Sequence, residues 1–298
     1  MMSQIENFGS VFGQVERSLQ NSRYYEALRQ LAEISLSCSK DVHFLVLMAR
    51  TQAAIKDYQN LIATQNELVK QRGTIADHLN LMVAYYTLGK INEALDVGLQ
   101  LQGRPMTFTE EQKLSKLMVR IYLEENDFEG ASEVITQSLQ SEADDFLLWA
   151  QGIIYLNQDQ KEKALDYFRK AVQLNTKNDQ AWVSLGLMHK EMGDEALSIA
   201  NIEKAIDLNP YNVSALKQLS TSVIKNADKT EAAFAHLRFY LSEFCFDEEI
   251  SLCHVQMLCQ LKEWDTAQLE LEKLILHRPE NAAVKNVKKS MMDAQMMC

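Results

Sequence analysis

The chain has 298 residues, of which 47% are hydrophobic, and its formal net charge is −11 at pH 7. A general affinity for nucleic acid or for an anionic membrane surface requires a basic protein, so this charge argues against both kinds of partner. Only 10 glycines and 3 prolines are present, and no alternating run of β-branched residues is bounded by turn residues, so the composition favours helices over strands.

The N-terminus and the cysteines indicate a compartment. The first residues, MMSQIENFGSVFGQ, lack a cationic segment followed by an apolar run, so we expect no signal peptide. No stretch of about 18 apolar residues occurs, so we expect no membrane insertion. Five cysteines without paired spacing favour a reducing environment. These features together predict a cytoplasmic protein.

Residues 1–74 are predicted to form degenerate helical repeats. Ser3 and Glu6 have the spacing of a capping box at a helix start. Apolar residues then recur at helical spacing as far as Leu19. Residues 25–34 are predicted to be the second helix of one pair, and residues 43–72 to form another pair.

A period of about 34 residues runs through the rest of the chain. It is clearest from Asp179, where small residues alternate with large ones along two predicted helices. In order, these residues are Trp182, Leu185, Gly186, Ile202 and Ala205. Small residues let two antiparallel helices approach closely, and large residues fill the space around them. Pro210 then ends the second helix.

This pattern resembles the tetratricopeptide repeat family, and in particular its bacterial-type adaptor and scaffold proteins. His189 and Ser198 depart from the family, which usually has an aromatic residue and an alanine at those positions. The resemblance implies an all-α fold, a right-handed α-α superhelix of about seven to eight helix pairs with a C-terminal capping helix.

The array is predicted to span residues 75–281. Its units lie near residues 75–105, 112–144, 145–178, 179–212, 213–246 and 247–281. Regularly spaced alanines mark their second helices: Ala94, Ala131, Ala164, Ala232 and Ala267. A longer loop, and a candidate hinge, is expected at residues 102–109, where Gly103 and Pro105 stop one helix and Thr109 with Gln112 caps the next.

Residues 282–298 are predicted to be a capping helix, because the last repeat of an array otherwise exposes its apolar side. The alternative is a Met-rich helix that binds a partner, since methionine adapts to many surfaces.

The resemblance also implies a binding surface, because positions 2, 5, 9 and 12 of each first helix face the concave groove in this family. Three neighbouring units then give an apolar, a basic and an apolar stretch. The candidate partner-binding residues are Leu79, Val83, Tyr86, Lys113, Lys116, Arg120, Phe146, Trp149 and Ile153. Such a groove fits a protein or peptide segment with apolar anchors and acidic residues between them.

Other interpretations of these residues remain open. Arg120 has Glu124 one turn later and Lys113 has Glu110 nearby, so the basic face is also compatible with simple solvation. Trp149 becomes a core residue if the register shifts by one, and another part of the chain is an alternative occupant of the groove. The residues that clamp chaperone tails in some relatives do not occur in the required order.

No motif for catalysis, a cofactor or a metal is evident. Phosphate-binding loops, the GxSxG elbow and HExxH are all absent from the sequence. Cys245, Cys253, His254 and Cys259 lie close together, but zinc ligands usually stand two to four residues apart, so buried thiols are expected instead. The prediction is a non-enzymatic adaptor; the alternatives are an assembly or self-association module that uses the array ends and, less favoured, an enzyme with an unrecognised site.

Overall fold

The computed structural model describes the backbone of residues 2–139, 143–223, 230–244 and 246–296, and the side chains of residues 8–139, 143–222, 231–244 and 246–291. Every regular element within these ranges is an α-helix. The chain divides into two compact units, Met1–Glu142 and Ala143–Cys298. The all-α helix-pair fold is therefore confirmed, while the finer division at residues 74 and 281 stays a prediction.

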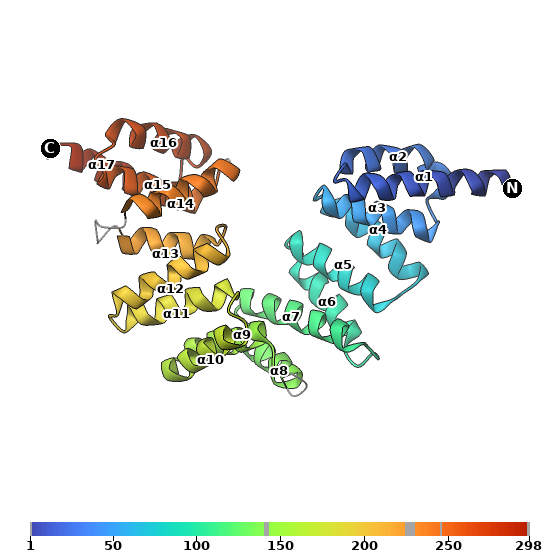
Figure 1. The fold of residues 1–298 in the computed structure, drawn as a ribbon, viewed down its shortest axis with the longest axis horizontal. Helices are drawn as coiled ribbons and strands as arrows, with labels where there is room; N and C mark the ends of the chain where they lie inside the picture. Colours follow the sequence, from blue (N-terminus) through green and yellow to red (C-terminus); the bar gives the residue numbers. More distant parts are fainter. Residues whose placement is uncertain (1, 140–142, 224–229, 245, 297–298) are drawn as a thin grey trace. The chain divides into compact units, whose positions relative to one another are not determined.

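Each unit is a stack of antiparallel helix pairs (Figure 1). The helices of the first unit are α1 (Met2–Gln20), α2 (Tyr24–Cys38), α3 (Val42–Ala54), α4 (Tyr58–Gln71), α5 (Ile75–Thr87), α6 (Ile91–Leu101), α7 (Phe108–Glu124) and α8 (Phe128–Ser138). Those of the second unit are α9 (Asp145–Asn157), α10 (Lys161–Leu174), α11 (Asp179–Glu191), α12 (Glu195–Leu208), α13 (Val213–Val223), α14 (Thr230–Glu243), α15 (Glu248–Gln260), α16 (Trp264–His277) and α17 (Ala282–Met296).

Wherever the structure describes the turn inside a pair, that turn has the same form. One residue adopts a left-handed conformation, and the amide of the next residue donates to a carbonyl near the end of the first helix, as from Asp57 to Gln52 and from Asp194 to His189, both at 2.9 Å. The left-handed residues are Ser22, Lys56, Gly89, Asn126, Asp159, Gly193 and Lys262. The first six stand 33 to 37 residues apart, so the period extends into the first unit.

Two facing positions decide how closely the helices of a pair approach. We number each repeat so that its left-handed residue is position 15. Position 8, on the first helix, then packs against position 24, on the second helix. In α9 and α10 these are Gly152 and Phe168, and a Cβ on Gly152 would lie 2.4 Å from the Phe168 ring. In α11 and α12 they are Gly186 and Ile202, and a Cβ on Gly186 would lie 2.7 Å from the end of the Ile202 side chain. A glycine here permits the close approach because any side chain would overlap its partner.

The second unit also links successive pairs through their loops. Asp145 accepts hydrogen bonds from the side-chain amides of Asn175 and Asn178, at 3.1 and 2.8 Å. Asp179 accepts two from the next loop, from Asn209 and Asn212, both at 2.8 Å. At the starts of α9 and α11, one carboxylate therefore holds the following loop, and the second asparagine of that loop also caps the next helix.

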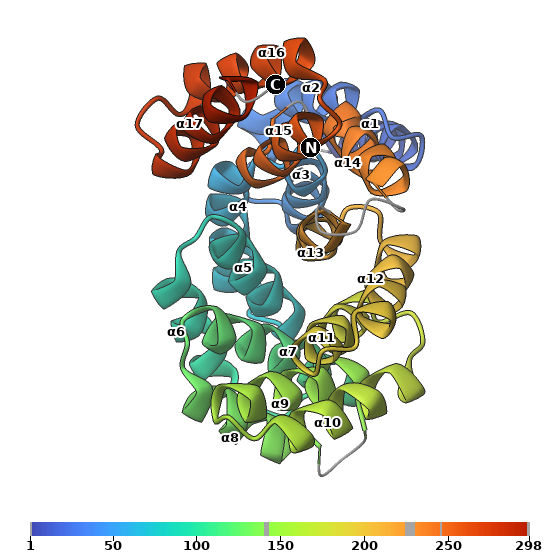
Figure 2. The same ribbon diagram turned by 90° about the vertical axis from the view of Figure 1, so that its left-hand side faces the viewer.

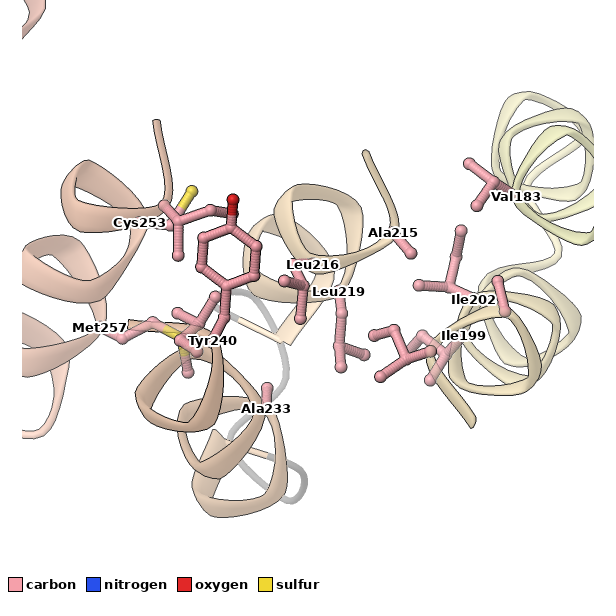
Figure 3. Packing of buried hydrophobic residues seen from close by; sticks show 14 residues of the cluster. Val183, Ile199, Ile202, Ala215, Leu216, Leu219, Ala233, Tyr240, Cys253 and Met257 are labelled. Atoms are coloured by element: carbon pink, nitrogen blue, oxygen red, sulfur yellow. The ribbon is translucent and has the colours of Figure 1, made fainter. Parts of the chain in front are cut away.

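The cores of the second unit run continuously through neighbouring pairs. Figure 3 shows one cluster, in which Ile202 of α12, Leu219 of α13 and Met257 of α15 are buried. Val284 and Met291 of α17 are buried against α15 and α16, which agrees with the predicted capping role of this helix. The methionines after Met291, on which the alternative rests, have side chains outside the described residues.

Several local predictions were wrong. Helix α7 begins at Phe108, and its capping box is formed by Thr107 and Glu110 rather than by Thr109 and Gln112. In α14 the buried small residue is Ala233, whereas Ala232 is exposed. Each segment offers two candidates, adjacent alanines in α14 and two threonines near the start of α7. Packing selects Ala233, whereas the local hydrogen bonds between Thr107 and Glu110 select the cap of α7. Helix α1 already includes Met2, and the side chains of Ser3 and Glu6 lie outside the described residues.

Candidate functional site

The predicted surface residues of the first unit lie on α5 and α7. Val83 is exposed and Tyr86 is half-buried, but Leu79 is 7% exposed and belongs to the core, so its predicted place in the groove was wrong. Helix α7 starts earlier than expected, yet the left-handed Asn126 still puts Lys113 and Arg120 at positions 2 and 9 of their repeat.

Tyr86 joins the two helices of this surface. Its hydroxyl donates to the carboxylate of Glu124 in α7. Burial and this hydrogen bond raise the pKa of Tyr86 to about 12, and the nearby charge of Arg120 opposes the increase. Arg120 and Glu124 therefore meet at Tyr86, in agreement with the interpretation that the basic face is balanced within the unit. Lys116 is half-buried and Lys113 is exposed.

The predicted apolar face of α9 is mostly covered. Phe146 is 9% exposed, so the expectation that it faces the groove was wrong. Trp149 is half-buried, its ring lies 5.5 Å from that of Phe146, and its indole Nε1 donates to Ser184 Oγ of α11 at 2.9 Å. Ile153 is half-buried and packs against the same core as Trp149. The next repeat thus occupies much of the face that the sequence left free.

The nine predicted residues fall in both compact units. A single apolar–basic–apolar groove that combines them stays a prediction.

A cavity of about 760 Å³ lies within the second unit. Its walls come from α11, α13, α15, α16 and α17, and ten of the described residues line it: Lys190, Gln218, Thr221, Gln256, Cys259, Gln260, Trp264, Val287, Ser290 and Met291. Cavities of about 300–1,000 Å³ are typical of ligand sites, so this one is large enough to bind part of a partner.

Five of these ten residues occupy positions that the family resemblance assigns to the groove, which are positions 2, 5, 9 and 12 of a first helix. Counted from the first residue of each helix, Lys190 and Cys259 occupy position 12, and Thr221, Gln256 and Ser290 occupy position 9. Extending the rule from α9 to the later helices would have found these five residues. Trp264, at the start of a second helix, follows no such rule and was missed.

The cavity lining combines polar and apolar side chains and carries little charge. Lys190 is the single charged side chain among the ten lining residues, and its Nζ donates to the Gln218 amide oxygen at 3.2 Å. Burial raises the pKa of the Cys259 thiol, so the thiol stays protonated at neutral pH and is a weak nucleophile. Amides, hydroxyls and one ammonium group bind polar ligands well, but they form no paired acid and base.

A smaller cavity of about 350 Å³ lies within the first unit, between α3, α4 and α5. Ala49 and Gln65 line it and occupy the facing positions 8 and 24 of their pair. Gln65 is buried, and its amide oxygen has no hydrogen-bond partner. The cavity therefore coincides with a poorly filled pair position.

The cysteine and histidine cluster belongs partly to the core. Cys253 and His254 are buried, and burial lowers the pKa of His254. Cys245 lies outside the described residues. Across the part of the chain that the structure describes, no group of three or more His, Cys, Asp or Glu side chains is placed to hold a metal ion.

No helix among the described residues combines the length and the apolar character that a membrane-spanning segment requires.

The stacked helix pairs and the larger cavity define a class of protein. It is a helix-pair repeat protein with a cavity lined mainly by the first helices of its pairs. Comparison with known proteins identifies the repeat: residues 146–178 and residues 179–212 each match the tetratricopeptide repeat family. Residues 146–212 therefore consist of two tetratricopeptide repeats.

Several proteins share parts of this array. Anaphase-promoting complex subunit 3 of Schizosaccharomyces pombe is 28% identical over 137 residues, which are 45% of this chain and 20% of that protein. The peroxisomal targeting signal receptor of Komagataella phaffii is 36% identical over 74 residues, 25% of this chain and 13% of the receptor. The chain thus spans a fifth or less of the length of these relatives.

Among solved structures, a chain of an APC/C hetero-tetramer is similar in fold. It has a TM-score of 0.62 and 13% identity, and the match covers 89% of this chain and 59% of that one. At this identity the similarity concerns the fold alone. It supports the α-α solenoid architecture.

Proposed function

We propose that the protein is a non-catalytic adaptor that binds a segment of a partner protein along the first helices of its second unit. The observation that carries this proposal is the 760 Å³ cavity, whose lining has hydrogen-bonding groups and apolar surface but no paired acid and base. Tetratricopeptide repeats generally mediate protein–protein interaction, and a subunit of a complex and a targeting-signal receptor are among the relatives.

The basic residues of α7 are proposed as a second contact area. Lys113, Lys116 and Arg120 share a face of that helix and suit acidic residues of a partner. Val83, Tyr86, Trp149 and Ile153 remain proposed apolar contacts, with the largest role expected for Val83 because it is the most open. Arg120→Glu tests the basic area.

Blocking the cavity tests the proposal directly. Thr221 is exposed and lines the cavity, so Thr221→Trp introduces a large ring without disturbing the core. We expect affinity capture from the source cell, followed by mass spectrometry, to lose partners with this variant. Ala200→Trp, at an exposed position on α12, is the matched control and should retain them. Equal capture by the wild type and Thr221→Trp would contradict the proposal.

Assembly remains the second candidate, and one observation favours it. Tyr211, Phe239 and Phe244 are exposed, and the Tyr211 ring lies 5.9 and 5.6 Å from the other two. Contiguous exposed aromatic surface usually marks an interaction site. If this surface joins two copies of the chain, the mass measured by light scattering should rise with concentration, and Phe239→Ser should abolish the rise.

A further inference from the structure

The two ends of the second-unit cavity differ in chemistry. Lys190 supplies a positive charge from α11, and α13 and α15 supply the amides of Gln218, Gln256 and Gln260. The α16 and α17 side is apolar, with Trp264, Val287 and Met291. Because α11 packs on α13, α13 on α15 and α15 on α17, these groups follow one another in order across the unit.

The helix spacing sets the distance between the two ends. Packed helices lie about 8–10 Å apart, so three steps place the axes of α11 and α17 roughly 24–30 Å apart. One helix radius with side chains, about 5–6 Å, is subtracted at each end. The open span is then roughly 14–18 Å, and an extended chain at about 3.3 Å per residue crosses it with about four to six residues.

We propose that this cavity selects an extended internal segment of a partner protein in which an acidic side chain and a large apolar side chain stand about four to six residues apart. The carboxylate pairs with Lys190, and the apolar side chain packs against Trp264, Val287 and Met291. The glutamine amides both donate and accept hydrogen bonds, so they satisfy the peptide backbone between the two anchors. This inference rests on the proposed function and adds the chemistry and the spacing of the two anchors of the bound segment.

A random library of acetylated, amidated decapeptides on beads tests the proposal, because the capped ends remove terminal charges. The wild-type protein should enrich peptides with Asp or Glu about four to six residues from Phe, Trp, Leu or Met. Lys190→Glu should weaken the binding of these peptides by at least about tenfold and should enrich Lys or Arg at the acidic position. Lys204→Glu, an equal charge change at an exposed position of α12, is the control and should behave as the wild type.

The outcomes separate the inference from the proposed function. Enriched peptides without the paired spacing, or with a pattern that Lys190→Glu leaves unchanged, would overturn the inference while the adaptor function stands. Binding that appears only when the library has a free C-terminal carboxylate would also overturn it. No enrichment of any peptide would overturn both. Equal thermal unfolding of the two lysine variants, followed by circular dichroism, shows that the difference lies in the cavity.

Discussion

Two helix pairs, one in each unit, build the same contact with opposite distributions of side-chain size. In α9 and α10 of the second unit the first helix carries the small residue and the second helix the large one, Gly152 and Phe168. In α5 and α6 the order is reversed, because Met82 stands at position 8 and Gly98 at position 24, and a Cβ on Gly98 would lie 3.0 Å from the end of Met82. The combined size of the two side chains at positions 8 and 24 matters more than which helix carries the larger one.

The connections between pairs differ in the same way. In the second unit, a carboxylate at the start of α9 and another at the start of α11 each accept hydrogen bonds from two asparagines of the next loop. Figure 2 shows the stacked helices α9 to α12 to which these residues belong. In the first unit, by contrast, Thr74 and Thr107 form capping boxes within their own helix starts. The carboxylate–asparagine contact recurs with the period, whereas the capping boxes are local. The two family matches, at residues 146–178 and 179–212, cover the repeats of α9 to α12.

The largest expected effect comes from adding one methyl group at the tight contact. Gly152→Ala should destabilise the second unit by about 3 kcal/mol, because the new Cβ would overlap the rigid Phe168 ring. Gly98→Ala in the first unit should cost less, about 1 kcal/mol, because the flexible end of Met82 can move aside. Native-state hydrogen exchange of α9 and α5 measures each unit separately.

A double substitution provides the control for this contact. Phe168→Leu combined with Gly152→Ala should recover part of the stability that the single change removes, since it makes room for the methyl group. Equal losses for the two glycine substitutions would contradict the size argument.

Removing a carboxylate that holds a loop should have the next largest effect on stability. Asp179→Ala leaves two asparagine amides without their acceptor, so we expect a loss of about 2 kcal/mol from the second unit. Urea unfolding followed by circular dichroism gives the free energy of unfolding. Asp207→Ala, at an exposed position of α12, is the control and should change it by less than about 0.5 kcal/mol.

Acid should weaken the first unit through one buried carboxylate. Burial raises the pKa of Asp77, but hydrogen bonds from Arg72 and Thr74 and the charge of Arg72 outweigh this effect and lower the pKa below its usual value of 3.8. The carboxylate therefore stabilises the unit above about pH 4, and this contribution is lost as the pH falls through the lowered pKa.

The same capping box can be tested at neutral pH. Thr74→Ala should cost about 1 kcal/mol. Asp77→Asn should remove the corresponding part of the acid dependence of hydrogen exchange in α5. An unchanged acid profile in Asp77→Asn would show that other carboxylates control it.

The smallest expected effect is a gain in stability. Gln65→Leu replaces a buried amide whose oxygen has no partner with an apolar side chain of similar size, opposite Ala49. We expect the first unit to become more stable by about 1 kcal/mol, measured by hydrogen exchange in α4. A loss of stability would mean that the amide has a role that the packing does not reveal.

Most of the fold could be predicted from the sequence. The helices, the period and the small and large positions depend on residues within one pair, and Gly186 with Ile202 indicates a close contact by spacing alone. The pair of α5 and α6 was harder to predict because its small and large residues, Gly98 and Met82, are exchanged between the helices. A consensus pattern expects the small residue on the first helix. It therefore does not detect a pair in which the small and large residues have changed places, although the two helices still pack closely.

The candidate site was predictable only in part. By itself the sequence determined which helices pair and which positions repeat, because local periodicity encodes them. Only the tertiary structure decided which repeated positions stay open. Phe146 and Leu79 occupy positions 2 and 5 and are buried, while Thr221 and Gln256 at position 9 line a cavity. The physical reason is that each exposed area depends on side chains from the next helix pair, about 34 residues away in the chain.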